Sequence, residues 1–363
     1  MPISLYMLNV NKACQLRCEW CYAQGQGYST KDNMPLELAM QINKMLAGSV
    51  EARILGGEPT LYPHLYPLLL NLRENNTASA VVSNGLIFSD EDEVKQLKDA
   101  GVGRVSVSVK AFGNDEYAKR TGSRAYCQTL RAIENLAKND VRSSTSITLT
   151  GANYPQAPRM VKDAARAGSR NFHFNFCVPV FGQKGESEYL LPPERHSWAV
   201  MEVIDAVESC GAKYGIELMV PFCWFQPSVL LSLFQAARIF SGCSSWTKRS
   251  VCFDSNGGVF VCNSFTGYPF AKFGVDFTNH EELCRKLENQ QSFFQMMRRA
   301  PSAHCLSCCF QGVCGGGCPI RWTAVDPSTI TGGDKFLPLI NSFTKCFKEE
   351  GENGNGNNGT DGG

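Results

Sequence analysis

Residues 5–21 read LYMLNVNKACQLRCEWC and combine the two features that decide the fold. The short apolar run Leu5–Val10 has the composition of a buried strand, and Cys14, Cys18 and Cys21 follow it within a predicted loop. The same alternation of a short apolar run with a helical run continues downstream. Because strands that alternate with helices form βαβ units, the sequence predicts a parallel sheet covered by helices.

Six such units can be counted before the pattern changes. The predicted strands are Leu5–Val10, Ala52–Leu55, Ala80–Ser83, Val105–Val109, Ser146–Thr150 and Phe172–Val178. Helices are predicted near residues 35–47, 64–74, 90–100, 127–139, 155–167 and 194–214. Three glycines fit helix C-termini, namely Gly48, Gly101 and Gly168. Six right-handed units in series predict an α/β fold, a partial (β/α)6 barrel that binds ligands at the C-terminal ends of its strands.

The composition restricts the partners of the chain. Its 363 residues are 43% hydrophobic and 19% charged, which is typical of a globular protein with more than one domain. With 35 Lys and Arg against 34 Asp and Glu, the net charge of +1 supplies no field to hold nucleic acid or an anionic membrane. Neither a signal peptide nor an apolar run of ~20 residues is found, so we expect a cytoplasmic protein. In that reducing compartment, the 17 cysteines indicate metal binding or catalysis rather than disulfides.

The first three cysteines have the spacing C-x3-C-x2-C directly after a predicted strand. Three thiolates can bind three irons of a [4Fe–4S] cluster and leave the fourth iron open for a substrate or cofactor. Two other interpretations remain: Cys14, Cys18 and Cys21 could form one buried face of a helix, or a zinc site that lacks one ligand.

With Trp20 before the last cysteine, this motif resembles the signature of the radical S-adenosylmethionine (SAM) superfamily. The resemblance implies that SAM chelates the open iron through its amino and carboxylate groups. One-electron reduction then yields a 5′-deoxyadenosyl radical that abstracts a hydrogen atom from the substrate. The cofactor supplies this chemistry, while the protein orients it and excludes water.

Further positions match the SAM-binding pattern of the superfamily. They are Trp20, Gly56, Gly57, Glu58, Pro59, Ser83, Asn84, Ser108, Arg120, Asn153 and Asn175. The resemblance implies that residues 56–59 receive the SAM ammonium group and that Ser108 and Arg120 hold its carboxylate. Lys110 stands where the family has an Asp. For the last two asparagines, an ordinary turn or core amide is an equally good explanation.

The C-terminal cysteines resemble a SPASM domain, the seven-cysteine module appended to many radical SAM enzymes. The matching residues are Cys243, Cys262, Cys305, Cys308, Cys314, Cys318 and Cys346. The resemblance implies two auxiliary [4Fe–4S] clusters, one on Cys243, Cys262 and Cys318 and the other on Cys305, Cys308, Cys314 and Cys346. Cys252 is a possible fourth ligand of the former, which could also be open. A zinc ribbon would use only the four residues from 305 to 318. Remaining cysteines, Cys223 among them, are expected to be buried small hydrophobes.

These patterns predict four segments. Residues 1–215 form the radical SAM partial barrel, 216–242 a bridging helical linker, and 243–347 the auxiliary-cluster domain. Residues 348–363 are almost wholly Gly, Asn and acidic residues, and we expect a disordered tail.

The resemblance to SPASM-bearing enzymes implies modification of a ribosomally made precursor peptide, by cross-linking or backbone rearrangement. Formylglycine formation in a sulfatase is the alternative, but those enzymes place an Asp where this chain has Asn263, whose amide cannot accept a proton. A non-catalytic iron–sulfur carrier and a zinc-bound nucleic-acid binder are also considered. No catalytic acid or base can be named. The motif begins at residue 14, so we expect either a separate leader-recognition protein or recognition of the leader by strand addition at an exposed sheet edge. A flavodoxin or ferredoxin is expected as electron donor.

Overall fold

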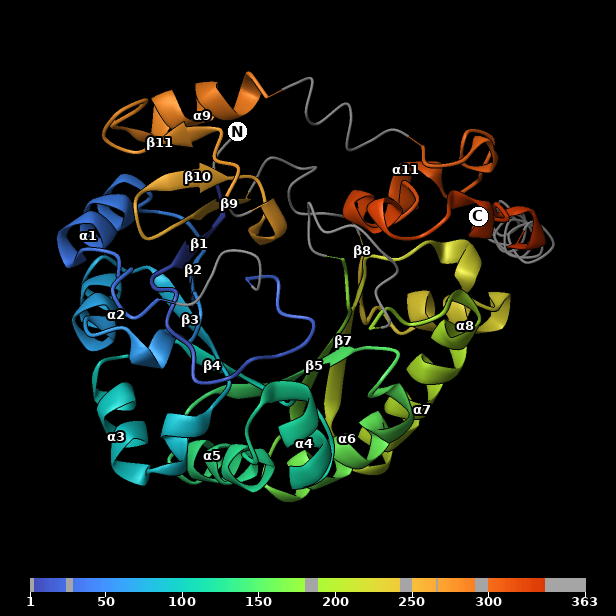
Figure 1. Ribbon diagram of the computed structural model, residues 1–363, viewed down its shortest axis with the longest axis horizontal. Coiled ribbons are helices and arrows are strands. Elements are labelled where there is room, and N and C mark those ends of the chain that lie inside the picture. Colours follow the sequence, from blue (N-terminus) through green and yellow to red (C-terminus); the bar gives the residue numbers. More distant parts are fainter. Residues whose placement is uncertain are drawn as a thin grey trace, which may run out of the picture.

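The structure is a computed structural model that describes residues 3–23, 29–179, 189–241, 250–265, 267–290 and 300–336. Within this part of the chain, eleven strands form one sheet in the order β11-β10-β9-β1-β2-β3-β4-β5-β6-β7-β8. Figure 1 shows that the sheet curves into an open ring with helices on its outer side. Of the predicted metal ligands, Cys243 and Cys346 lie outside the described residues, as does the tail 348–363.

The six predicted βα units are confirmed. Their strands are β1 (Leu5–Asn9), β2 (Glu51–Leu55), β3 (Ala78–Ser83), β4 (Arg104–Ser108), β5 (Ser143–Leu149) and β6 (Asn171–Phe176). The helices that follow them are α1 (Leu36–Met45), α2 (Leu65–Glu74), α3 (Glu91–Asp99), α5 (Tyr126–Lys138), α6 (Ala157–Arg166) and α7 (His196–Ser209). Gly48, Gly101 and Gly168 have φ values of 90°, 81° and 103°, as expected for left-handed residues after helices.

The predicted helix over 194–214 is too long. The helix α7 ends at Ser209, and Gly211 adopts a φ of 63°, which turns the chain into β7 (Lys213–Leu218). The barrel continues beyond the six predicted units, because β8 (Ile239–Ser241) pairs with β7 and all pairs from β1 to β8 are parallel. The predicted domain boundary after residue 215 therefore falls inside β7. Two more helices, α4 (Gly113–Thr121) and α8 (Pro227–Gln235), complete this part.

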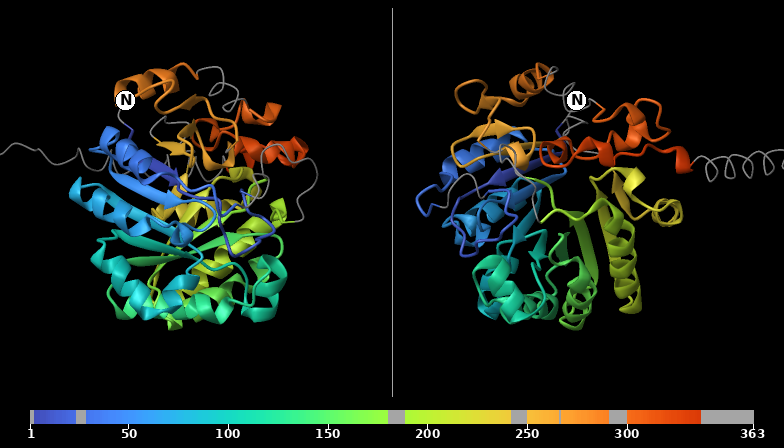
Figure 2. Two further views of the ribbon diagram at one scale, coloured as in Figure 1. Left: turned by 60° about the vertical axis from the view of Figure 1, so that its left-hand side comes forward. Right: turned by 45° about the vertical axis from the view of Figure 1, so that its right-hand side comes forward.

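The C-terminal segments pack against both edges of the barrel. The strand β9 (Ser250–Phe253) pairs in parallel with β1, and β10 (Gly258–Phe260) and β11 (Ala271–Lys272) extend that edge in antiparallel fashion. The helix α9 (His280–Glu288) follows β11, whereas α11 (Gln311–Cys314) belongs to the segment beside the β7 and β8 edge. Figure 2 shows both segments over the same end of the ring.

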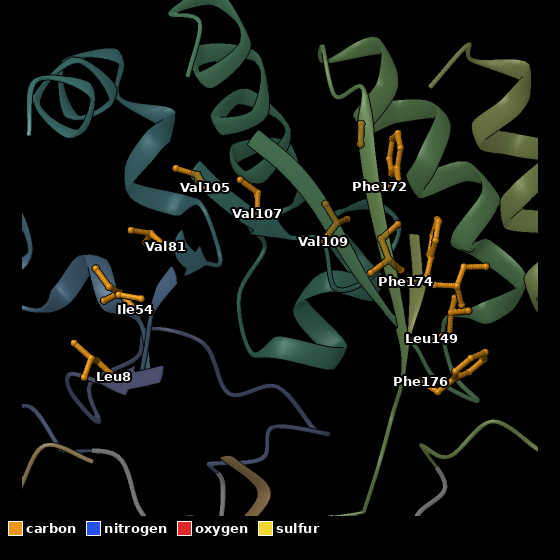
Figure 3. Packing of buried hydrophobic residues seen from close by; sticks show 14 of the residues in the cluster. Leu8, Ile54, Val81, Val105, Val107, Val109, Leu149, Phe172, Phe174 and Phe176 are labelled. Carbon is orange, nitrogen blue, oxygen red and sulfur yellow. The ribbon is translucent and has the colours of Figure 1, made fainter. Parts of the chain in front are cut away.

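The two faces of the parallel strands differ in burial. On β2, Ala52 and Ile54 are fully buried beneath the helices, while Glu51 and Arg53 alternate with them on the inner face and are partly exposed. The same helix-side layer continues through the other strands (Figure 3), where it contains Leu8, Val81, Val105, Val107, Leu149, Phe172, Phe174 and Phe176. The outer face is thus apolar, whereas the inner face of β2 carries charged side chains. Among the described residues, no helix has the length and apolar character needed to cross a membrane.

Candidate functional site

The loop after β1 carries Cys14, Cys18 and Cys21, all partly exposed. The C-terminal turn of α4 anchors it, since the carbonyl of Thr121 accepts from Arg17 N (2.7 Å) and the carbonyl of Arg120 accepts from Glu19 N (3.1 Å). In Figure 1 this loop crosses the open centre of the ring. Burial raises the pKa of the Cys14 thiol to about 11, so a bound cation would be needed to hold it as a thiolate at neutral pH.

The segment Gly56–Glu58 packs against the backbone directly before the cysteine loop. Gly57 N donates to Asn11 O (2.9 Å) and Glu58 N donates to Ala13 O (2.6 Å), while Asn11 Nδ2 donates to Glu58 O (2.8 Å). A Cβ on Gly57 would lie 2.3 Å from Ala13 O, which no side chain can tolerate. Glycine is therefore required here by the close approach of two backbones.

The carboxylate of Glu58 is buried and accepts hydrogen bonds from other residues of the chain. It accepts hydrogen bonds from Ser83 Oγ (2.7 Å), Asn84 N (2.8 Å) and both the amide and the hydroxyl of Thr60 (3.2 and 2.9 Å). Burial raises the pKa of Glu58, and these hydrogen bonds oppose the shift. The side chain ties the end of β2 to the end of β3. By contrast, Asn84 Nδ2 is buried and has no partner among the described residues, so its amide group is available to donate to a bound ligand.

Arg120 is paired with an acidic residue of the cysteine loop. Its guanidinium forms an ion pair with Glu19 at 2.9 Å and approaches Glu116 at 3.5 Å. Its Nε is buried and has no hydrogen-bond partner within the described part of the chain. Any anion held by Arg120 would therefore share this cation with Glu19.

The two asparagines singled out from the sequence differ in their surroundings. The side chain of Asn153 hydrogen-bonds backbone groups only. Its Oδ1 accepts from Thr150 N (2.9 Å), and its Nδ2 donates to Lys110 O and Thr148 O (3.1 and 2.9 Å). It fixes the loop after β5 against the loop after β4. Asn175 lies on the inner face of β6, and its buried Oδ1 has no partner among the residues that the structure describes.

A chain of polar contacts connects the cysteine loop to the β9–β10 segment. Tyr22 OH donates to Asn9 Oδ1 and to Gly56 O, both at 3.2 Å, and Asn9 Nδ2 donates to Asn263 Oδ1 at 3.1 Å. Cys252 Sγ lies 3.7 Å from the sulfur of Met7 on the neighbouring strand. Burial raises the pKa of Tyr22, and negative charge on Cys21, Cys252, Cys14 and Cys262 adds to the shift. The structure thus brings Cys252 and Cys262 to the same region as the first cysteine loop.

Other predicted thiols gather at the opposite edge of the sheet. Cys305, Cys308 and Cys314 line one cavity. Cys318 is placed by the hydrogen bond from its backbone N–H to Met219 O (3.0 Å). Across the described ranges, no group of three Cys, His, Asp or Glu side chains is arranged to hold a single metal ion.

Residues 8–170 match the sequence model of the Radical SAM superfamily. This part of the chain is a radical SAM domain. It contains the cysteine loop, the Gly56–Glu58 segment and α4, whose geometry is described above.

Solved structures resemble the chain well beyond the radical SAM domain. Streptococcus suis SuiB bound to its precursor peptide SuiA has a TM-score of 0.68 at 16% identity, over 87% of this chain and 72% of SuiB. The protein anSMEcpe with bound AdoMet and the Cp18Cys peptide has a TM-score of 0.67 at 18% identity, over 94% of this chain and 96% of anSMEcpe. At these identities the likeness shows a shared fold.

Relatives in sequence have several activities. The Fe-coproporphyrin III synthase of Methanosarcina barkeri is 23% identical over 342 residues, which are 87% of this chain and 83% of that protein. The GTP 3′,8-cyclase of Helicobacter pylori is 29% identical over 156 residues, which are 42% of this chain and 49% of that protein. The match therefore spans about half of the cyclase.

Sequence reasoning missed a charged layer on the inner face of the barrel. Glu51 pairs with Arg53 and with Arg104, each at 2.7 Å. Burial lowers the pKa of His173, with a further contribution from the two arginines, and raises the pKa of Glu217. A partial signal was available, because Arg53 and His173 alternate with apolar residues within predicted strands, whereas Glu51 and Arg104 lie one residue before predicted strands and Glu217 lies on a strand that was not predicted. They give the barrel a polar lining that could contact a polar substrate.

Lys110 was noted only as a departure from the family pattern. Burial raises the pKa of Cys18, and the positive charge of Lys110 opposes the shift. A cation in electrostatic range of the cysteine loop can favour a thiolate or an anionic ligand there.

Proposed function

We propose that the chain is a radical SAM enzyme that modifies a ribosomally synthesised precursor peptide. One observation carries the proposal: two cysteine-bearing C-terminal segments pack at the two edges of the barrel whose centre is crossed by the loop with Cys14, Cys18 and Cys21. Support for a peptide substrate comes from the likeness to SuiB and anSMEcpe, since the solved structures of both contain a bound peptide.

The residues present fit a SAM-binding cluster. Cys14, Cys18 and Cys21 would bind three irons, and SAM on the fourth would supply hydrogen-atom abstraction. The close packing of Gly57 positions the loop, and Asn84 Nδ2 offers an unused donor. Arg120 supplies positive charge for the SAM carboxylate beside its existing pair with Glu19.

Three [4Fe–4S] clusters form part of the proposal, one for SAM and two auxiliary. Cys252 and Cys262 lie beside the first cysteine loop, and Cys305, Cys308 and Cys314 surround their own cavity. Auxiliary clusters in these places would flank the barrel centre on both sides. A flavodoxin or ferredoxin would supply electrons, and a separate small protein would recognise the leader of the precursor.

The chemistry at Asn263 argues against formylglycine formation. Its Oδ1 accepts a hydrogen bond from Asn9 Nδ2, and an amide takes up no proton at neutral pH. We therefore favour cross-linking or backbone rearrangement of a peptide, both of which begin with abstraction of a hydrogen atom from the peptide.

The test is 5′-deoxyadenosine formation from SAM by the reconstituted protein under anaerobic conditions with dithionite. Wild type should form it, and the Cys14/Cys18/Cys21→Ala triple variant should not. Cys127→Ala, which removes an exposed thiol on α5, is the matched control and should behave as wild type. Mass spectrometry of candidate precursor peptides from neighbouring genes then tests modification. Equal 5′-deoxyadenosine from wild type and triple variant would overturn the assignment, and full iron loading without SAM cleavage, with or without peptide, would favour an electron carrier.

A further inference from the structure

The cavity beside the β7 edge is lined by one cysteine that the motifs did not include. Cys223 lies in the short turn Phe222–Trp224 after β7, more than eighty positions before the C-terminal cysteine motif. It lines the same cavity as Cys305, Cys308 and Cys314. We propose that Cys223 is the fourth thiolate of an iron–sulfur cluster held by these three cysteines. The inference rests on the proposed function only in requiring that the chain carries an auxiliary cluster.

The lining of the cavity suits an inorganic group held by thiolates. Apart from the four cysteines, its lining is apolar or glycine over most of its surface. Gly315, Gly316 and Gly332 have φ values of 54°, 80° and 76°, a region that residues with a Cβ rarely adopt. These glycines let the backbone turn tightly around the thiols without filling the space between them.

Hydrogen bonds on both sides of Cys223 fix it at the cavity. Phe222 N donates to Cys314 Sγ at 3.3 Å, and Trp224 Nε1 donates to Thr329 O at 3.2 Å. The carbonyl of Cys223 itself accepts from Lys335 Nζ at 2.7 Å. The turn after β7 is therefore bonded to the C-terminal segment at three successive residues. A cysteine held so firmly loses little further freedom when it binds a metal.

The charges around the cavity suit a cluster that carries negative charge. The Phe222 N–H already points at the Cys314 sulfur, and N–H···S bonds of this kind stabilise thiolates and tune cluster potentials. Lys335 adds a positive charge next to Cys223. Four thiolates complete the coordination of a [4Fe–4S] cluster that has no open iron. Ligands of a single zinc ion converge within ~2.3 Å of the metal, whereas a four-iron cluster holds its thiolates farther apart.

Two neighbouring cysteines do not line the cavity. Cys309 is exposed, and its Sγ lies 3.7 Å from Gly333 O and beside the thiol of Cys308, outside the lining. Cys318 does not line the cavity, and its charge acts on the buried Arg321. The family pattern implies Cys346 as the fourth ligand, whereas we propose Cys223. The experiments below decide between these two residues.

The first experiment uses wild-type protein in its reconstituted state. Anaerobic alkylation followed by peptide mapping should find Cys223 protected together with Cys305, Cys308 and Cys314, and all four should become reactive after the iron is removed by a chelator and oxidant. Cys210 is the internal control, because it is partly buried, as Cys223 is, and does not line this cavity. Rapid labelling of Cys223 in iron-loaded protein would refute its ligation.

The second experiment compares Cys223→Ser, Cys346→Ser and Cys210→Ser. Cys223→Ser should lose about one to four irons per chain, with either a three-iron EPR signal or loss of one cluster signal. Cys346→Ser and Cys210→Ser should keep the wild-type iron content and spectrum. The proposal fails if Cys223→Ser matches Cys210→Ser while Cys346→Ser loses the iron.

Failure of this inference can be told from failure of the proposed function. If wild type binds only ~4 irons, the auxiliary clusters themselves are absent and the proposed function is at fault. If wild type binds ~12 irons and Cys223 is unprotected, only the ligand assignment is wrong.

Discussion

Gly57→Ala should separate the backbone before the cysteine loop from the segment after β2 that positions it. The new Cβ would lie 2.3 Å from Ala13 O and 2.8 Å from Lys12 C, both backbone atoms. A carbon–oxygen contact needs ~3.4 Å, so the two segments must part by ~1 Å. Overpacking of this kind costs about 1–3 kcal/mol, and the three hydrogen bonds between the segments contribute about 1 kcal/mol each. The loop therefore loses about 4–6 kcal/mol of local stabilisation.

The assay follows both cluster loading and chemistry. A shift of ~1 Å in a catalytic group can cost ~100-fold in rate, so 5′-deoxyadenosine formation should fall at least that far, with loss of about four irons per chain. Gly312→Ala is the matched control, because Gly312 is exposed on α11 and a Cβ there meets no atom within 4 Å. If Gly57→Ala cleaves SAM within threefold of Gly312→Ala, the argument from close packing is wrong.

Three further predictions concern buried polar groups. Glu58→Gln should lower the free energy of unfolding by about 1–3 kcal/mol in urea titrations, because its amide would face the N–H of Asn84; an unchanged midpoint would contradict this. Tyr22→Phe should lower the free energy of unfolding by about 1 kcal/mol and weaken SAM binding in calorimetry, because two hydrogen bonds are lost; wild-type values of both quantities would contradict this. Burial lowers the pKa of His196 to about 3, so below pH 6.5 the unfolded chain takes up a proton that the folded chain does not. Stability should therefore fall by about 1.4 kcal/mol from this group between pH 7.5 and 5.5, and His196→Phe should remove that part of the pH dependence.

The strands and helices of the first six units could be predicted because their signals are local. The alternation of apolar runs and the glycines at helix ends need no knowledge of distant residues. Pairing of β9 with β1 could not be predicted in this way, since Leu5 lies opposite Ser250 and no local pattern links them. That pairing is what places Cys252 beside Met7.

The candidate site shows the same division. The spacing of Cys14, Cys18 and Cys21 predicts an iron–sulfur cluster from the sequence alone. Cys223 has no neighbour of its kind in the sequence, and only the turn after β7 brings it to the cavity. Asn153 illustrates the converse, because a residue chosen for its position after a strand turned out to bond the backbone of β5 and of two loops.

The pairing of β1 with β9 also sets a schedule for synthesis of the chain. Leu5 can pair with Ser250 only after that residue has been synthesised, 245 residues later. At ~5–20 residues per second, a ribosome needs roughly 12–50 s to cover that distance. Throughout this interval β1 is an open strand edge on the nascent chain, and such edges recruit other strands. The chain should accordingly depend on chaperones during translation, and fragments that stop before residue 250 should aggregate even though they contain the whole cysteine loop.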